Sequence, residues 1–247
     1  MRNESKNLMK RIVSLLFVLS LAACTGMPGK LASSDLEPGG TVAVVSLLGE
    51  SFHGIHIAPT VFGNIDYEAA VPDWNIDTLT EHAILPYLTQ TDFKNGIVLK
   101  HDSGLSQRLK DGWSFMHNGY DYDEIIGLAK AQGADKLILV QPVAYDNAPF
   151  YKPGYGFYER TSLLGKSNSC VYSLFLVSVF STHTGERLGM EWKLPCNMSE
   201  TELEWKDGFD KYSPNELELI RHKTEASVKE GVLGTLKLLG YLRTTKD

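Results

Sequence analysis

Along the chain, the spacing of apolar and polar residues changes between the period typical of β-strands and the period typical of α-helices. Residues 41–48, TVAVVSLL, form a continuous β-branched apolar run, which is typical of a strand buried on both faces. Residues 136–143, KLILVQPV, predict a second central strand. Residues 170–181 and 187–196 predict two strands joined by a Thr-Gly turn at 182–185. In the second of these strands Leu, Met, Trp, Leu and Cys alternate with outward-facing Arg, Gly, Glu and Lys, so we expect one covered and one wet face.

After the first predicted strand, the apolar residues have the spacing of an α-helix. Residues 77–90 carry an apolar stripe, and Thr78 and Glu81 have the spacing of a capping box. Pro86 lies inside this stretch and predicts a kink or an early end, because proline cannot continue the helical hydrogen bonds. After this helix, the stretch 96–100 predicts a short strand.

Two further helices have clear boundaries. Residues 121–132 can be capped by Asp121 and stopped by Gly133. The last helix, 214–239, begins with the sequence Ser-Pro-Asn-Glu at 213–216, which joins a capping box to a proline at the first helical position. Gly231 and Gly234 lie on this helix and are small enough to allow close approach to a sheet.

This order of elements predicts an α/β fold. We expect a mixed β-sheet with helices packed on it, in a single domain over residues 41–247 that ends in a hairpin and a helix. Residues 25–40 are rich in Gly, Pro and Ser and predict a flexible tether. Residues 146–166 are rich in Tyr, Phe, Gly and Pro and predict an inserted loop.

The amino terminus has the features of an export signal. Four basic residues lie in the first eleven, and residues 12–23 are apolar apart from two serines. This run is too short to span a bilayer, so residues 1–23 are interpreted as a signal peptide. The sequence Leu21-Ala22-Ala23-Cys24 resembles the lipobox of bacterial lipoproteins. The resemblance implies cleavage before Cys24, acyl chains on that cysteine, and residues 24–40 as a lipidated tether.

The resemblance also implies a location in the cell envelope. Thr25 follows the cysteine where lipoproteins retained in the inner membrane carry Asp, which favours an outer-membrane anchor facing the periplasm. Removing residues 1–23 takes away four basic residues and one acidic residue, which leaves 20 Lys and Arg against 29 Asp and Glu, a net charge of −9. An acidic body argues against nucleic-acid binding and against electrostatic adhesion to anionic lipid. Acyl chains would therefore provide the anchoring.

Two cysteines remain besides Cys24. In the periplasm Cys170 and Cys196 are candidates for a disulfide, and the alternative is two buried free thiols. The register of the hairpin decides between these alternatives. If the numbers of two directly opposite residues add up to about 366, Trp192 faces Leu174, and the two cysteines face each other at disulfide distance. A slip of two residues would leave the cysteines diagonal.

The body resembles a group of envelope proteins. AKAQGADKLILV, residues 129–140, is similar to the helix-to-strand step of the group that contains the curli-secretion lipoprotein, penicillin-binding-protein activators and the TolB amino-terminal domain. Residues 171–195 are similar to the hairpin of that group, and the closing helix fits as well. The resemblance implies a non-enzymatic protein that binds or assembles with another envelope protein, without a cofactor.

An aromatic cluster is the candidate partner-binding surface. Phe150, Tyr151, Tyr155, Phe157 and Tyr158 occur within nine residues of the expected loop. Aromatic residues dominate interface hot spots, and loops often carry function. The alternative is that the loop folds over the sheet edge and buries its own rings.

The alternative function is a serine hydrolase. Residues 44–54, VVSLLGESFHG, resemble the first block of GDSL-type esterases, with Ser51 as the nucleophile. The later Gly-x-Asn-Asp and Asp-x-x-His blocks of that family have no good match, so the activity would lack its base. The primary interpretation is therefore a protein that is not an enzyme.

Other polar groups have simpler explanations. His53 and His56 lie three apart in an extended context and would point to opposite faces, which argues against a metal site. His101, Asp102 and Ser103 are neighbours in sequence and are interpreted as a loop and a helix cap. Three acidic residues at 121, 123 and 124 lack a calcium-loop pattern and fit helix capping.

Overall fold

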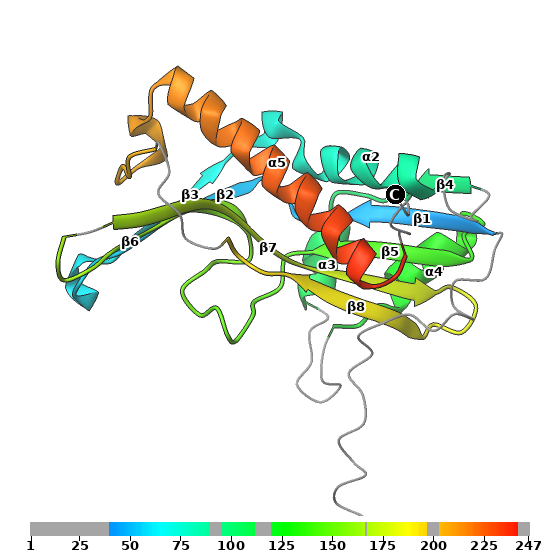
Figure 1. Cartoon of the computed structure of the whole chain (residues 1–247). Helices are drawn as coiled ribbons and strands as arrows, with labels where there is room; N and C mark the ends of the chain where they lie inside the picture. Colours follow the sequence, from blue (N-terminus) through cyan, green and yellow to red (C-terminus); the bar gives the residue numbers. More distant parts are fainter. Residues whose placement is uncertain (1–39, 89–94, 112–119, 166, 197–202, 242–247) are drawn as a thin grey trace, which may run out of the picture.

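The chain forms an eight-stranded mixed sheet with helices on both faces (Figure 1). The computed structural model describes residues 40–88, 95–111, 120–165, 167–196 and 203–241. The strands are β1 (Thr41–Ser46), β2 (Ser51–Ile57), β3 (Ile65–Ala70), β4 (Asn95–Val98), β5 (Lys136–Gln141), β6 (Gly154–Thr161), β7 (Ser167–Ser181) and β8 (Arg187–Lys193). The helices are α2 (Ile76–Leu88), α3 (Leu105–Asp111), α4 (Asp123–Ala131) and α5 (Pro214–Leu238), with 3-10 turns η2 (Val61–Gly63), η3 (Pro72–Trp74) and η5 (Phe209–Lys211). The mixed α/β fold predicted from the sequence, with its closing hairpin and helix, is confirmed.

The long strand β7 organises the sheet. The strand order is β3-β2-β6-β7-β5-β1-β4, and β8 also pairs with β7. Residues 167–174 of β7 pair antiparallel with β6, and residues 176–181 pair antiparallel with β5. Residues 175–180 pair with β8 along the opposite edge from β5. β1 is parallel to both β4 and β5, and β2 is parallel to β6.

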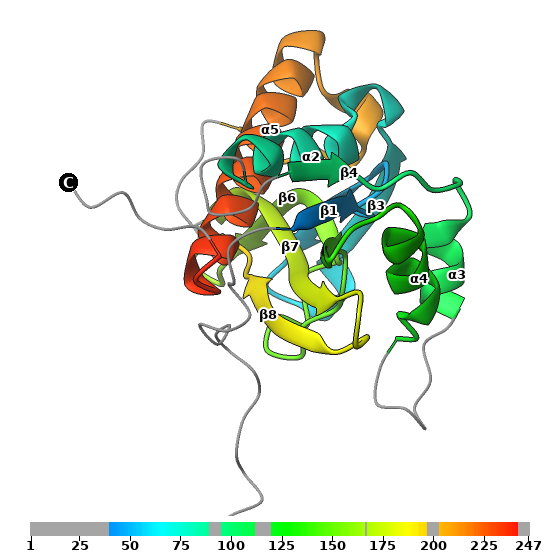
Figure 2. The same ribbon diagram turned by 90° about the vertical axis from the view of Figure 1, so that its right-hand side faces the viewer.

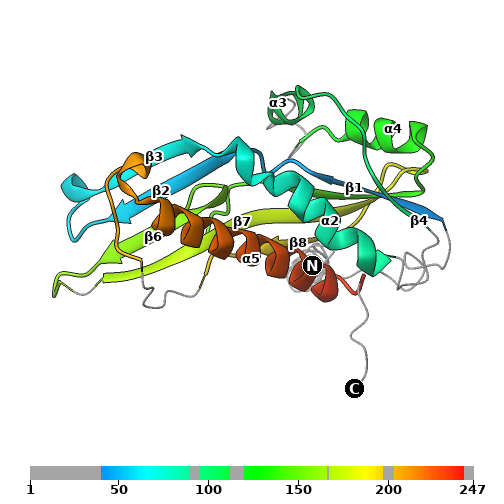
Figure 3. The ribbon, with the colours of Figure 1, turned by 90° about the horizontal axis from the view of Figure 1, so that it is seen from above.

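The helices divide between the two faces of the sheet. α2 and α5 lie side by side over one face (Figure 3). α3 and α4 cover part of the other face (Figure 2). Odd-numbered residues of β7 belong to the core under α2 and α5, whereas Phe180 packs with α3 and α4. A third cluster, at the far end of that second face, contains Ile55, Tyr158, Cys170, Tyr172 and Leu174.

The junction between β1 and β2 is held by two carboxylates of α2. Asp77 accepts hydrogen bonds from the Ser46 hydroxyl at 2.6 Å, the Leu48 N–H at 2.7 Å and the Gly49 N–H at 3.1 Å. Glu81 accepts from the Ser46 N–H at 3.1 Å. Burial raises the pKa of both carboxyl groups, against the hydrogen bonds that lower it. The capping box predicted for this helix is therefore wrong, since its glutamate binds the sheet. The helix continues two residues beyond its internal proline.

The predicted start of the last helix is confirmed. The Ser213 hydroxyl accepts from the Glu216 N–H, and the Ser213 N–H donates to the Glu216 carboxylate at 2.7 Å. Lys206 lies 2.7 Å from the same carboxylate, and these contacts lower the pKa of Glu216 to about 2. The sequence 213–216 therefore marks the boundary of α5 correctly.

The predicted loop over 146–166 is wrong in its second half, where β6 forms. Gly156 lies where the backbones of β2 and β6 approach closely, because a Cβ on it would lie 2.0 Å from the His53 carbonyl oxygen. Gly154 has a positive φ of 102° and begins the strand. The glycines that suggested a loop thus serve a central strand.

The hairpin of β7 and β8 has a different register from the predicted one. Trp192 pairs with Leu176 instead of Leu174, and an irregularity lies between Val179 and Phe180. The cysteines are therefore not directly opposite, yet a disulfide joins Cys170 and Cys196 across a Cα–Cα distance of 6.4 Å. The prediction of one covered and one wet face for β8 is also wrong, because both faces are covered: Trp192 packs against the third cluster, while Lys193 pairs with buried Phe175 and lies on the face under α5.

Candidate functional site

The predicted lipid attachment site lies outside the described residues. The described residues begin at residue 40, so they exclude Cys24 and all of the tether 25–40 except its last residue. The structure therefore does not test the anchor. Among the described helices, none combines the length and the apolar character needed to cross a bilayer.

The aromatic cluster predicted as a docking surface belongs mostly to the core. Tyr155, Phe157 and Tyr158 lie in β6 and are at most 2% exposed. Tyr151 is half-buried, and its ring stacks on Tyr158 with a centroid distance of 4.3 Å. Of the five side chains only Phe150 is exposed. The prediction of a shared binding surface is wrong, because β6 pairs on both sides and buries its rings between the sheet and the segments packed on it.

Ser51, the candidate nucleophile of the hydrolase interpretation, has no catalytic base beside it among the described residues. Ser51 begins β2 and pairs with Ala70. No hydrogen bond joins Ser51 to a histidine within the described ranges. A serine nucleophile needs an adjacent base. The structure therefore does not favour an esterase.

The two histidines of β2 point to opposite faces, as predicted. His56 contacts Glu159 at 3.1 Å and stacks on Trp205. Burial lowers the pKa of His53, with Glu68 and Lys152 as its charged neighbours. No group of three or more metal-ligating side chains occurs in the part of the chain that the structure describes.

The remaining polar candidates have structural roles. Asp102 accepts from the Gly104 N–H at 2.7 Å just before α3. Arg108 binds Asp102 and Glu124 and so ties α3 to α4. Asp121 accepts from the backbone N–H at 123, but the N-cap of α4 is Tyr122, which makes no side-chain capping bond. The predicted loop before α3 is confirmed, whereas the cap predicted at Asp121 is wrong, because α4 begins two residues beyond it.

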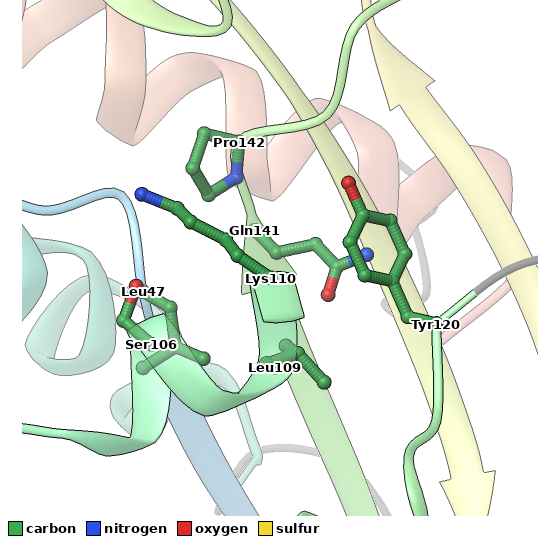
Figure 4. A pocket seen from close by; sticks show the side chains of 7 residues that line it. All are labelled: Leu47, Ser106, Leu109, Lys110, Tyr120, Gln141 and Pro142. Atoms are coloured by element: carbon green, nitrogen blue, oxygen red, sulfur yellow. The ribbon is translucent and has the colours of Figure 1, made fainter. Parts of the chain in front are cut away.

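A small cavity lies beyond the carboxyl ends of β1 and β5 (Figure 4). Its free volume is about 10 Å³, and the buried oxygen of Gln141 has no hydrogen-bond partner. One water molecule needs roughly 10–15 Å³ and two or more polar partners. The cavity therefore suits a single structural water and is too small for a substrate.

A much larger open groove runs between β8 and the carboxyl-terminal half of α5. Its volume is about 550 Å³, within the range of ligand and side-chain pockets. The lining combines small helical residues with apolar and charged ones: Trp192, Lys193, Ser227, Glu230, Gly231, Gly234, Thr235, Lys237 and Leu238. We call this the β8–α5 groove.

Two glycines on α5 line the groove, and their lack of a side chain leaves the helix backbone close to the groove. A Cβ on Gly231 would lie 2.9 Å from three carbons of the Lys193 side chain, so a larger residue there would force the lysine side chain to shift. Gly234 has no atom within 4 Å of the corresponding position and leaves open space. Leu238 is 60% exposed at the end of the groove. The two glycines were visible in the sequence, but the space beside them was not.

The charge in the groove is mixed. Burial lowers the pKa of Lys193, and Glu230 opposes that shift. The Lys193 ammonium donates to the Leu194 carbonyl at 2.8 Å. The groove therefore holds a partly buried amine beside an apolar floor.

The outer edge of β8 has no partner strand in the part of the chain that the structure describes. Among the described strands, β8 pairs with β7 alone. The Trp192 N–H donates to the Glu191 carboxylate at 3.0 Å, so it points away from β7. Because orientation alternates along an antiparallel strand, the Met190 N–H points the same way. An exposed edge of this kind is a template for an added strand, and side chains commonly protect it.

Comparison with known proteins gives only distant structural likenesses. No family model matches the chain, and no curated protein matches it. The chain is similar to the LpoB C-terminal domain from Salmonella enterica at 11% identity and a TM-score of 0.26, over 66% of this chain and 84% of that one. It is similar to protein XCC0632 from Xanthomonas campestris at 6% identity and a TM-score of 0.31, over 87% and 89%. It is similar to lipoprotein GNA1162 from Neisseria meningitidis at 11% identity and a TM-score of 0.25, over 62% and 79%. These values are too low to assign a family.

Proposed function

We propose that this protein is a membrane-tethered, non-catalytic module of the bacterial envelope that binds an extended segment of another envelope protein along β8. The anchor is proposed at Cys24 from the lipobox-like sequence 21–24, on the periplasmic face of the outer membrane. The observation that carries the binding role is the open edge of β8 beside the β8–α5 groove. An added strand would gain backbone hydrogen bonds from the edge and specificity from the groove.

Glu191 and Lys193 support this mode of binding. Each side chain occupies a backbone group near the edge, the Trp192 N–H in one case and the Leu194 carbonyl in the other. An incoming strand would take over these backbone groups and release the two side chains. Because the displaced groups are charged and return to water, the exchange costs little. The edge is thereby protected from unspecific pairing but remains available to a matched segment.

A pair of substitutions at Met190 tests strand addition. Met190→Pro removes the outward N–H without touching the inward bonds to β7, whereas Met190→Ala shortens the side chain and keeps the N–H. A photo-crosslinking amino acid is placed at Leu238, in the groove, in intact cells. The same amino acid at exposed Lys130 on α4 is the control position. Far-UV circular dichroism checks that both Met190 variants fold.

The expected result is one discrete adduct with an envelope protein from position 238, and none from position 130. Met190→Ala should keep at least half of the adduct, and Met190→Pro should reduce it about tenfold or more, the change expected for loss of roughly 1.4 kcal/mol. An adduct with twice the mass of the chain would show a second copy in the groove and overturn the proposal. Equal yields from the two Met190 variants would rule out strand addition.

A further inference from the structure

Two hairpin tips at one end of the sheet expose large apolar side chains. Val61 and Phe62, in η2 between β2 and β3, are 76% and 96% exposed. Leu163 and Leu164, between β6 and β7, are 84% and 89% exposed. We call these four residues the apolar tips. Single exposed apolar residues are common on proteins, but two adjacent pairs at the same end of a sheet need an explanation.

The topology brings the two tips together. β2 and β6 are parallel and stay in register to the pair Ile57 and Arg160, so both strands leave the sheet at the same end. The β2–β3 and β6–β7 hairpins are neighbours in the strand order. Their centres are separated by two interstrand spacings, about 10 Å. Figures 1 and 3 show both turns at the end remote from the start of β1.

Both turns are held by their own hydrogen bonds. In the first tip, Gly63 and Asn64 donate backbone bonds to Thr60 and Val61, and the Asn64 side chain accepts from the Ala58 N–H at 3.0 Å. In the second, the Gly165 N–H bonds back to Ser162 with a positive φ of 74°. The apolar side chains are therefore presented outward on ordered turns, and η2 contains no buried residue.

The character of the tips favours lipid as the occupant. Residues 58–65 and 161–165 contain no charged side chain, in a chain that is 22% charged, and the nearest charged residues in sequence are Asp66, Arg160 and Lys166. Convex tips with Val, Phe and Leu lack the Trp, Tyr and Arg that dominate protein hot spots, and a fluid bilayer adapts to a protruding shape. Uncharged apolar tips also avoid the cost of bringing charge into the headgroup boundary.

The chain outside the described residues is long enough to allow this contact. The proposed tether, residues 25–40, has 16 residues and spans at most about 53–58 Å. It joins β1 at the end of the sheet opposite the tips. The six residues of β1 and the seven of β2 together rise by about 43 Å, and four residues join the two strands. A body lying along the bilayer could therefore touch it at both ends.

We infer that the apolar tips enter the lipid surface and give the protein a second contact with the membrane, separate from the acylated cysteine. This inference relies on the proposed anchor for proximity to lipid but not on the β8–α5 groove. Once the acylated cysteine is in the bilayer, the contact of the apolar tips with lipid becomes intramolecular. Even a weak affinity of the tips for lipid then keeps the folded domain on the membrane surface. The contact is apolar, so it should not depend on salt or on anionic lipid.

The test reads the environment of a tip directly. Leu164→Cys carries an environment-sensitive nitrobenzoxadiazole group, and Glu186→Cys, in the exposed turn between β7 and β8, carries the same group as the control. The full acylated chain is incorporated into vesicles of phosphatidylethanolamine and phosphatidylglycerol with brominated acyl chains. A second sample uses a carboxyl-terminal hexahistidine form held by a nickel-chelating lipid. The second sample keeps the tip measurement valid if Cys24 carries no lipid, and flotation of the untagged chain scores the anchor separately.

The expected result is at least twofold stronger quenching by bromine at position 164 than at position 186, in both samples and at low and high salt. Adding Val61→Ser and Phe62→Ser should remove most of this difference, and exposed positions of this kind should leave the thermal unfolding unchanged. Equal quenching at 164 and 186 would overturn the inference. Shielding of position 164 only in native membranes, and not in protein-free vesicles, would identify a protein partner and overturn it equally.

Discussion

Removing the carboxylate of Asp77 should destabilise the whole sheet. Asp77→Ala takes away the acceptor of three hydrogen bonds at the junction of β1 and β2, from Ser46, Leu48 and Gly49. Two of the donors are backbone N–H groups that leave the strand ladder there and have no other acceptor among the described residues. An unsatisfied donor costs about 1–3 kcal/mol, and alanine leaves room for water, which favours the low end.

The expected loss is about 3 kcal/mol, with roughly 1 kcal/mol for each donor. For a domain of this size 1 kcal/mol shifts Tm by about 2–4 °C, so Tm should fall by about 6–12 °C. Thermal unfolding followed by far-UV circular dichroism at neutral pH measures this shift. The matched control is Asp73→Ala, which removes an exposed carboxylate four residues earlier. Its effect should stay within about 0.5 kcal/mol. A fall in Tm below about 2 °C for Asp77→Ala, or equal shifts for the two variants, would refute the assigned role.

Two further predictions concern pH and redox state. Because burial raises the folded-state pKa of Asp77, the part of its contribution that depends on protonation is full below the unfolded pKa of about 3.9 and is lost as pH rises through the folded value. The hydrogen bonds to the carboxyl group are a separate part, and they remain at neutral pH. The stability of the native protein relative to Asp77→Asn should therefore decrease from pH 4 to pH 8 in urea unfolding, and an increase would contradict the burial argument. Reducing the disulfide of Cys170 and Cys196, which are 26 residues apart, should lower the free energy of unfolding by about 3.5 kcal/mol. Reductant should have no such effect on a variant with alanine at both positions, and unchanged native stability under reduction would contradict the prediction.

The sequence predicts the elements whose signals are local. β1, β5, α4 and α5 combine clear periodicity with boundary residues such as Ser213 and Gly133, and the structure places them within a few residues of the predicted bounds. The capping box of α5 is fully local, since its two residues bond to each other. Local chemistry of this kind does not depend on how the sheet is ordered.

The errors arise where another part of the chain decides the conformation. Gly156 has the composition of a loop, but it is required by the nearby His53 carbonyl, 103 residues earlier in sequence. Glu81 has the spacing of a cap, but it binds the β1–β2 junction. The irregularity after Val179 shifts the register of β8 by one residue, which is half of the difference from the predicted register, and no residue pattern indicates it.

The candidate sites also divide into features that the local sequence indicates and features that depend on distant parts of the chain. The aromatic residues were recognised as a group, but the pairing of β6 on both sides turned them into core. The β8–α5 groove depends on an edge strand, two glycines and a lysine from distant segments, so composition alone could not reveal it. The apolar tips depend on the parallel alignment of β2 and β6, which brings together turns about 100 residues apart.

The position of β7 has a consequence for how the chain can fold. β5 and β6 both hydrogen-bond to β7, and β8 adds to its other edge. A chain that emerges with its amino terminus first cannot complete the β6 half of this sheet before residue 174 is free, or the β5 half before residue 181 is free. Its earlier strands have only each other to pair with, and such partial sheets keep unpaired edges. Late arrival of the central strand therefore delays compaction, which would suit the export across a bilayer that we propose for this chain.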